Sequence, residues 1–257
     1  MHGGGYAFHA AVSRRFADML AALLGLRVFA PDYRLTPEHP HPAQIEDALA
    51  AFRHLLACGI DPKDIVVIGD SAGGHLALML LQALRDAGLP QPMLAIGLCP
   101  WTDTGNRGES LRANDRYDLV QGYMALRFGE WLARAGAFTR EELSPIHQDF
   151  SGLAPLYLQG GGREVLIDMI RDFASVVARQ DCDVTLDVWP QMTHDFQAHG
   201  RTRPESGEAI DRIRAAIAHY RARDVRTPFE TCAQTELRSV RGSPEAAYFA
   251  EAASNSS

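Results

Sequence analysis

A serine stands between two glycines in Gly69-Asp70-Ser71-Ala72-Gly73, directly after the apolar run 65–68. Glycines on both sides of a serine are typical of a tight strand-to-helix turn, where bulkier neighbours would collide and the serine hydroxyl is lifted above the sheet. The free N–H groups of the following helix would stabilise an anion formed there. The pattern predicts a nucleophilic serine that carries out acyl transfer. The alternative, a glycine-rich turn with a capping serine, is disfavoured by the flanking strand and helix patterns.

A serine hydroxyl needs a base that accepts its proton, and the base needs an acid that orients it. Of the ten histidines, His194 directly follows an expected strand at 184–189, where such a base belongs in the order serine, acid, histidine. His199 lies five residues further into a polar loop. We therefore expect His194 to be the base and the other histidines to be structural.

Three carboxylates follow another expected strand, at 155–159. Glu164 occupies the loop after this strand, whereas Asp168 and Asp172 fall inside the next helical pattern. Glu164 is our predicted orienting acid, with Asp168 as the second choice. Glu164 also has a non-catalytic explanation, because a carboxylate at a helix N-terminus is favoured by the helix dipole.

A glycine triplet lies almost at the first residue, in Met1-His2-Gly3-Gly4-Gly5. The tetrahedral intermediate of acyl transfer needs backbone N–H groups aimed at its oxyanion, and glycines let the backbone approach that closely. With the serine motif present, we expect Gly3, Gly4 and Ala72 to donate these N–H groups. Taken alone, three glycines would equally suit a flexible N-terminal segment.

The elements that must position these residues alternate along the chain. Strand and helix in repeated succession predict a mostly parallel sheet with helices on both faces. An insertion at 101–148 is expected to contain a polar loop and a helix at 119–134, and residues 224–257, which have weak periodicity, are expected to be disordered. The expected strands are 26–30, 65–69, 93–98, 155–159 and 184–189, and the expected helices are 9–24, 42–57, 72–87, 166–180 and 206–223.

Composition limits the partners. The chain has 257 residues, of which 46% are hydrophobic, enough for a packed core, and a formal charge of −7 that argues against nucleic acid. Small neutral molecules are the partners that this composition favours. Four scattered cysteines indicate free thiols in a reducing cytoplasm. We expect no secretory signal and no membrane span, since charges interrupt the apolar stretch 16–30.

Together these motifs resemble the hormone-sensitive-lipase-like family of α/β-hydrolases, the bacterial esterases marked by H-G-G-G and G-D-S-A-G. The segments 31–40 and 100–103 also resemble family motifs, and the likeness covers roughly residues 2–222. It implies an α/β-hydrolase catalytic domain at 1–223, with Ser71 as nucleophile, His194 as base, and Gly3, Gly4 and Ala72 as the oxyanion hole. Glu164 stands where the family usually has Asp, although some members use Glu. The resemblance further implies short-chain acyl esters as substrates and no metal or organic cofactor, and it admits a homodimer.

The chain departs from the family at its start, where members carry a helical cap and about three strands before H-G-G-G. Here only Met1 precedes His2. We expect the cap and first strands to be missing, through truncation or a misassigned start codon. The strand just before His2 would lie between 26–30 and 65–69, so its absence should either open a slot or make those two strands pair directly.

The function expected from these residues is that of a serine carboxylesterase working through an acyl-enzyme intermediate. One alternative is a non-catalytic ligand-binding protein on the same fold, as in the hydrolase-like gibberellin receptors, which lack the catalytic histidine. His194 weighs against this alternative. The second alternative is an inactive fragment that keeps the sequence motifs but no longer has the intact fold.

Overall fold

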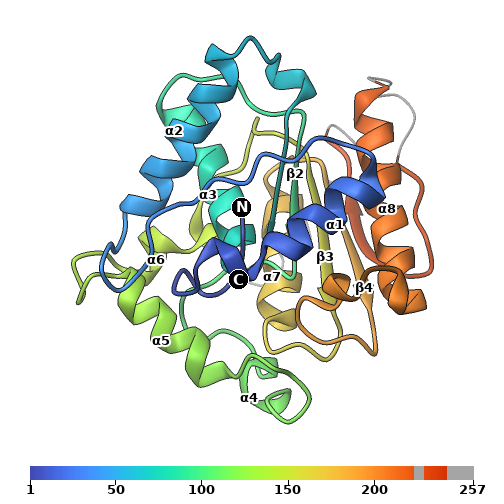
Figure 1. The fold of residues 1–257 in the computed structure, drawn as a ribbon. Helices are drawn as coiled ribbons and strands as arrows, with labels where there is room; N and C mark the ends of the chain where they lie inside the picture. The colour runs from blue at the N-terminus through green and yellow to red at the C-terminus, as the bar shows by residue number, and fades with distance from the viewer. Residues whose placement is uncertain (223–228, 242–257) are drawn as a thin grey trace.

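The computed structural model describes residues 1–222 and 229–241. Its helices and strands follow the alternation expected from the sequence (Figure 1). In chain order they are η1 (Ala10–Val12), α1 (Arg14–Leu24), α2 (Ala43–Ala57), η2 (Pro62–Asp64), β1 (Val66–Asp70), α3 (Ser71–Asp86), β2 (Leu94–Leu98), α4 (Ser110–Ala113), α5 (Gly122–Leu132), α6 (Arg140–Leu143), η3 (Pro145–His147), β3 (Leu156–Gly161), α7 (Ile167–Arg179), β4 (Val184–Trp189), η4 (Phe196–Thr202), α8 (Pro204–Arg221) and β5 (Thr235–Ser239).

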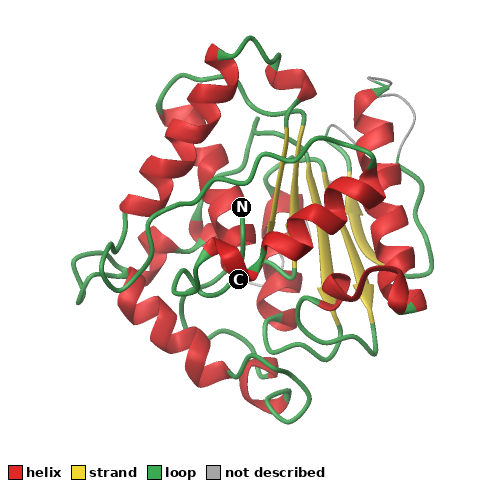
Figure 2. Ribbon diagram, in the orientation of Figure 1, coloured by secondary structure: helices red, strands yellow, loops and turns green. Residues whose placement is uncertain are grey.

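The strands form one sheet in the order β1-β2-β3-β4-β5 (Figure 2). The first four strands are parallel, and β5 pairs antiparallel with β4. Parallel neighbours in sequence order require right-handed crossovers, which α3 and α7 supply. The expected mostly parallel sheet is confirmed.

Helices cover both faces of the sheet, as expected. Alternate residues of β2 explain how: Leu94 and Ile96 share a core cluster with Ile213 of α8, whereas Ala95 joins the cluster that contains α3 and α7. Helix α1 packs beside α8, and α2 packs on α3. A strand buried on both faces must be apolar at every position, which is why β2 gives a continuous hydrophobic run.

Two expectations from the sequence are wrong. Residues 26–30 form no strand in the described structure, because the backbone there has no neighbouring strand with which to pair. Part of the supposedly disordered tail is ordered, since Thr235–Ser239 form β5 and Leu237 packs against the core. The remainder of that tail lies outside the described residues, apart from 229–234 and 240–241.

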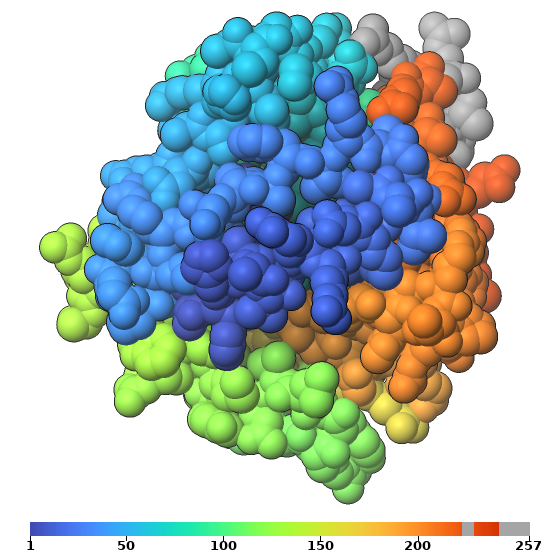
Figure 3. Space-filling model, viewed as in Figure 1, coloured from blue at the N-terminus to red at the C-terminus, as the bar shows by residue number. Residues whose placement is uncertain are grey.

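An open slot separates β1 from the segment at 26–31, so the first of the two outcomes expected at the chain start is the one observed. The slot is a cavity of about 900 Å³ that β1, α1 and this segment line. Among the described residues, β1 pairs with β2 alone. At one end the amino group of Met1 donates a hydrogen bond to the carbonyl of Ile68 at 2.7 Å. Figure 3 shows the N-terminal segments, in blue, spread across this face.

The exposed apolar side chain of Phe29, which lines the slot, should contribute little to stability. Phe29 is 51% exposed there, whereas Phe173 of α7 is fully buried. We expect Phe173→Ala to lower the free energy of unfolding by about 3–5 kcal/mol and Phe29→Ala by about 0.5 kcal/mol or less. Urea denaturation followed by circular dichroism measures both. A loss at Phe29 as large as that at Phe173 would mean that the slot is closed in solution.

Candidate active site

The parallel strands bring four distant residues to one edge of the sheet. Ser71 follows β1, Cys99 follows β2, Glu164 comes three residues after β3, and His194 comes five residues after β4. The carboxyl ends of parallel strands in an open α/β sheet lie at the same edge, where ligands bind. The topology therefore brings the loops that carry Ser71, Glu164 and His194, three of the residues predicted for acyl transfer, to the same edge of the sheet.

The turn at Ser71 is as tight as its glycines predict. Ser71 adopts φ 52°, the left-handed region that non-glycine residues rarely occupy. A Cβ at Gly69 would collide with the carbonyl group of Gly73, and a Cβ at Gly73 would collide with the carbonyl groups of Met1 and His2. The N–H of Trp101 donates to the carbonyl of Ser71 at 3.1 Å and ties the turn to the loop after β2. Larger residues at 69 or 73 would displace the serine.

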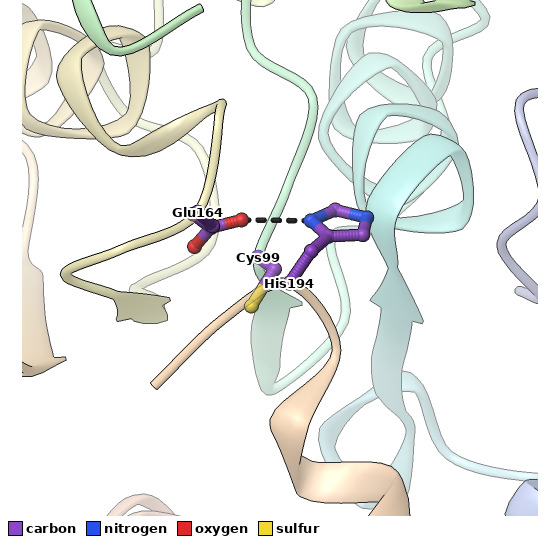
Figure 4. A group of neighbouring side chains, drawn as sticks. All are labelled: Cys99, Glu164 and His194. Carbon is purple, nitrogen blue, oxygen red and sulfur yellow. Dashed lines mark hydrogen bonds and ion pairs between the residues drawn. The ribbon is translucent and has the colours of Figure 1, made fainter. Parts of the chain in front are cut away.

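Glu164 and His194 meet as the sequence predicted. Oε2 of Glu164 lies 2.7 Å from Nδ1 of His194, and its Oε1 accepts the N–H of Gly161 at 2.7 Å (Figure 4). The Glu164 side chain is fully buried and that of His194 is 3% exposed. A Cβ at Gly161 would press on the carbonyls of Met192 and Thr193, so glycine allows the histidine loop to lie on the end of β3.

The other acids considered for this role have partners elsewhere. Asp168 Oδ2 accepts the N–H of Ser110, at 2.8 Å, and anchors α4. Asp172 lies 3.4 Å from the guanidinium of Arg107. The hydrogen bond to His194 thus belongs to Glu164, the first choice from the sequence.

Sequence reasoning missed Asp118, which joins the acid loop to the histidine loop. Its Oδ2 accepts the N–H of Val165 at 2.8 Å, and its Oδ1 accepts the N–H groups of Leu119 and His194 at 2.8 and 3.2 Å. A carboxylate shared between two loops fixes their separation. Asp118 ends the polar loop of the insertion, and its spacing gave no signal, because its partners are far away in sequence.

Aromatic side chains hold the glycine loop in place. The His2 ring stacks on Tyr33 with centroids 4.1 Å apart, and the Tyr33 hydroxyl donates to the His2 carbonyl. Tyr6 shares a hydrogen bond of 2.6 Å with Nδ1 of the buried His75. The loop is therefore anchored from the segment after α1 and from α3, which accounts for its order so near the first residue.

The buried Asp70 faces the glycine loop. Burial raises the pKa of Asp70, while the positive charge of the Met1 amino group acts in the opposite direction. A Cβ at Gly3 would overlap the Asp70 carboxylate, so glycine is required there. The backbone of Gly3 thus packs directly against Asp70.

Carboxylates dominate the electrostatics around His194. Burial alone would lower the pKa of His194, but Asp195, Glu164 and Asp118 outweigh it and raise the pKa to about 10. Nε2 of His194 is buried and has no hydrogen-bond partner among the described residues. This nitrogen is the atom that would have to receive a proton from Ser71.

One cluster could be mistaken for a metal centre. Potential ligand atoms of Cys99, Glu164 and His194 all lie within 4.8 Å of one another (Figure 4). Glu164 and His194 are already hydrogen-bonded to each other, and burial raises the pKa of the Cys99 thiol well above its usual value, which disfavours the thiolate that a metal would need. We therefore assign no metal to this cluster.

Comparison with known proteins identifies the fold family. A family model described as the α/β-hydrolase fold matches residues 1–198. An acetyl-hydrolase of Streptomyces hygroscopicus is 38% identical over 213 residues, which cover 82% of this chain and 71% of that protein. The chain belongs to the family of proteins with the α/β-hydrolase fold.

Further relatives agree with this family. An esterase of Acinetobacter venetianus is 32% identical over 82% of this chain and 70% of its own. The crystal structure of an esterase from the bacterial hormone-sensitive lipase family superposes with a TM-score of 0.81 at 37% identity, covering 86% of this chain and 75% of that one. The resemblance inferred from the motifs is confirmed, as is the α/β-hydrolase fold.

The proton on His194 should make stability depend on pH. The pKa of His194 is raised from 6.5 to about 10 in the folded protein. Its contribution to stability is therefore complete below pH 6.5 and is lost as the pH rises through about 10. We expect the free energy of unfolding to fall across this window more in wild type than in His194→Gln. Urea titrations of both proteins at several pH values measure their free energies of unfolding. The same pH dependence in wild type and His194→Gln would contradict the prediction.

Proposed function

We propose that this chain is a serine carboxylesterase, in which Ser71 attacks the ester carbonyl and His194 accepts the serine proton. His194 then protonates the leaving alcohol and activates water against the acyl-enzyme. Hydrolysis of esters in general is supported by the relatives named as esterases. The serine nucleophile and the acyl-enzyme intermediate are proposals for this chain.

The hydrogen bond between Glu164 and His194 is the observation that carries the proposal. A carboxylate bonded to Nδ1 fixes the tautomer whose Nε2 is free to accept a proton, and it stabilises the imidazolium that forms. This bond measures 2.7 Å and lies at the same edge of the sheet as the Ser71 turn. A purely structural glutamate would not need to be buried against the histidine ring.

The proposed oxyanion hole consists of the N–H groups of Gly3, Gly4 and Ala72. Ala72 is the second residue of α3, where helical N–H groups have no intrahelical acceptor. Because the backbone of Gly3 packs against the Asp70 carboxylate, Gly4 and Ala72 are the stronger part of this proposal. Losing one such donor costs about 2.7–4 kcal/mol of transition-state stabilisation.

Short acyl esters are the proposed substrates. The Streptomyces relative is named an acetyl-hydrolase, and a similar esterase, at 32% identity and TM-score 0.80, was soaked with p-nitrophenyl butyrate. The chemistry proposed here requires no metal or organic cofactor. None of the helices in the described part of the chain has the length and hydropathy needed to cross a bilayer. A cytoplasmic location and a homodimer stay predictions.

Labelling tests the nucleophile directly. We expect a fluorescent phosphonate ester to label wild type, and Ser71→Ala to remove both the label and the hydrolysis of p-nitrophenyl butyrate. Cooperative unfolding of the variant serves as the control for folding. Unchanged hydrolysis by Ser71→Ala would disprove the mechanism, and a folded wild type that turns over no ester would favour the ligand-binding alternative.

Substitutions at Glu164 and Asp168, two carboxylates close together in the sequence, test which residue is the acid. Glu164→Gln keeps the volume but loses the charge on Nδ1, so we expect kcat to fall by about 10³–10⁴-fold. Asp168→Asn is the matched control and should retain most of the activity, because Asp168 bonds α4 instead. Steady-state kinetics of both variants test this assignment. A larger loss of kcat in Asp168→Asn than in Glu164→Gln would identify Asp168 as the acid.

A further inference from the structure

A second carboxylate approaches the histidine from the side opposite Glu164. Oδ2 of Asp195 lies 3.4 Å from Nε2 of His194, whereas Glu164 occupies Nδ1. Asp195 adopts φ 52°, and its N–H donates to the Cys99 sulfur at 3.4 Å. Aspartate is one of the few residues other than glycine that adopt this left-handed backbone readily.

The contact leaves two polar atoms unpaired. Nε2 of His194 and Oδ1 of Asp195 are both buried, and neither has a hydrogen-bond partner within residues 1–222 and 229–241. Burial of polar atoms without a partner is unfavourable, so a proton between the ring and the carboxylate would be stabilised there. The Asp195 side chain as a whole is 29% exposed, so this proton can exchange with solvent.

Other charged or titratable groups also face His194, but from different directions. Glu164 binds Nδ1, and Asp118 accepts the main-chain N–H of His194. Asp70, at the end of β1, interacts electrostatically with the Met1 amino group and with His194. The Cys99 sulfur lies within 4.8 Å of ligand atoms of both Glu164 and His194. Among the described carboxylates, Asp195 is the one within ion-pair distance of Nε2.

We propose that Asp195 is a positioning residue that holds a proton on Nε2 of His194 in the resting protein and so delays its action as a base. Before Ser71 can transfer its proton to Nε2, the proton already there must leave to solvent, and Asp195 opposes that loss. Rising pH removes it and activates the site. This inference rests on the proposed function, because it assumes that Nε2 is the atom that receives the serine proton.

Asp195→Asn tests the charge with little change of shape. Asparagine tolerates the left-handed backbone as aspartate does, and Asp195→Gly is the second variant should the first fail to fold. We expect the acid limb of the pH profile of kcat/KM to move down by about one unit or more, giving about tenfold higher kcat/KM below that limb. Asp211→Asn, which removes an exposed carboxylate of α8 paired with Arg201, is the matched control and should leave the limb unchanged.

A readout independent of activity separates the two proposals. The pKa of His194 can be followed by NMR of ¹⁵N-histidine-labelled protein, with its signals assigned by their loss in His194→Gln. A lower pKa in Asp195→Asn supports the inference even if the protein turns over no ester, an outcome that would refute only the proposed function. An unchanged pKa and an unchanged acid limb would overturn the inference. So would a uniform loss of kcat/KM at every pH, because Asp195 would then assist the reaction.

Discussion

The buried contact between Glu164 and His194 is the interaction on which the rest of the site depends. A carboxylate and an imidazole that both lie in the interior are stable only when they satisfy one another. Their bond fixes the loop after β3 against the loop after β4, and Asp118 bonds to the main chain of both loops. Two further side chains lie close to this pair: the Cys99 sulfur is within 4.8 Å of ligand atoms of both residues, and Asp195 Oδ2 is 3.4 Å from Nε2 of His194.

Concentrating acids around one imidazole has an electrostatic consequence. The same carboxylates that orient His194 also favour its protonated form, and a protonated imidazole cannot accept a proton. In the mechanism we propose, Glu164 on Nδ1 and Asp195 near Nε2 therefore act on the reaction in opposite ways. In that mechanism the first carboxylate orients the base, whereas the second one restrains it until the pH rises. The balance between them depends on where each oxygen lies relative to the ring.

The fold supports this site with unequal strength across the sheet. Strands β2, β3 and β4 have a neighbour on both sides and are buried on both faces. Strand β1, which ends directly before Ser71, has a neighbour on one side within the described residues and borders the slot. The Met1 amino group and the stacked ring of His2 supply part of the support at that edge. The serine turn therefore relies more on loop contacts than the acid and histidine loops do.

The sequence by itself predicted the contact between Glu164 and His194, the tight turn at Ser71 and the order of the core elements. Local rules sufficed there: glycines flanking Ser71 demand a tight turn, and continuous apolar runs demand strands that are covered on both faces. Tertiary structure alone decided that residues 26–30 form no strand and that 235–239 do, because a strand exists only where another offers it hydrogen bonds. It also decided the contacts that Asp118 and Asp195 make with the loops around His194. Such contacts depend on distances between loops far apart along the chain, which no local pattern records.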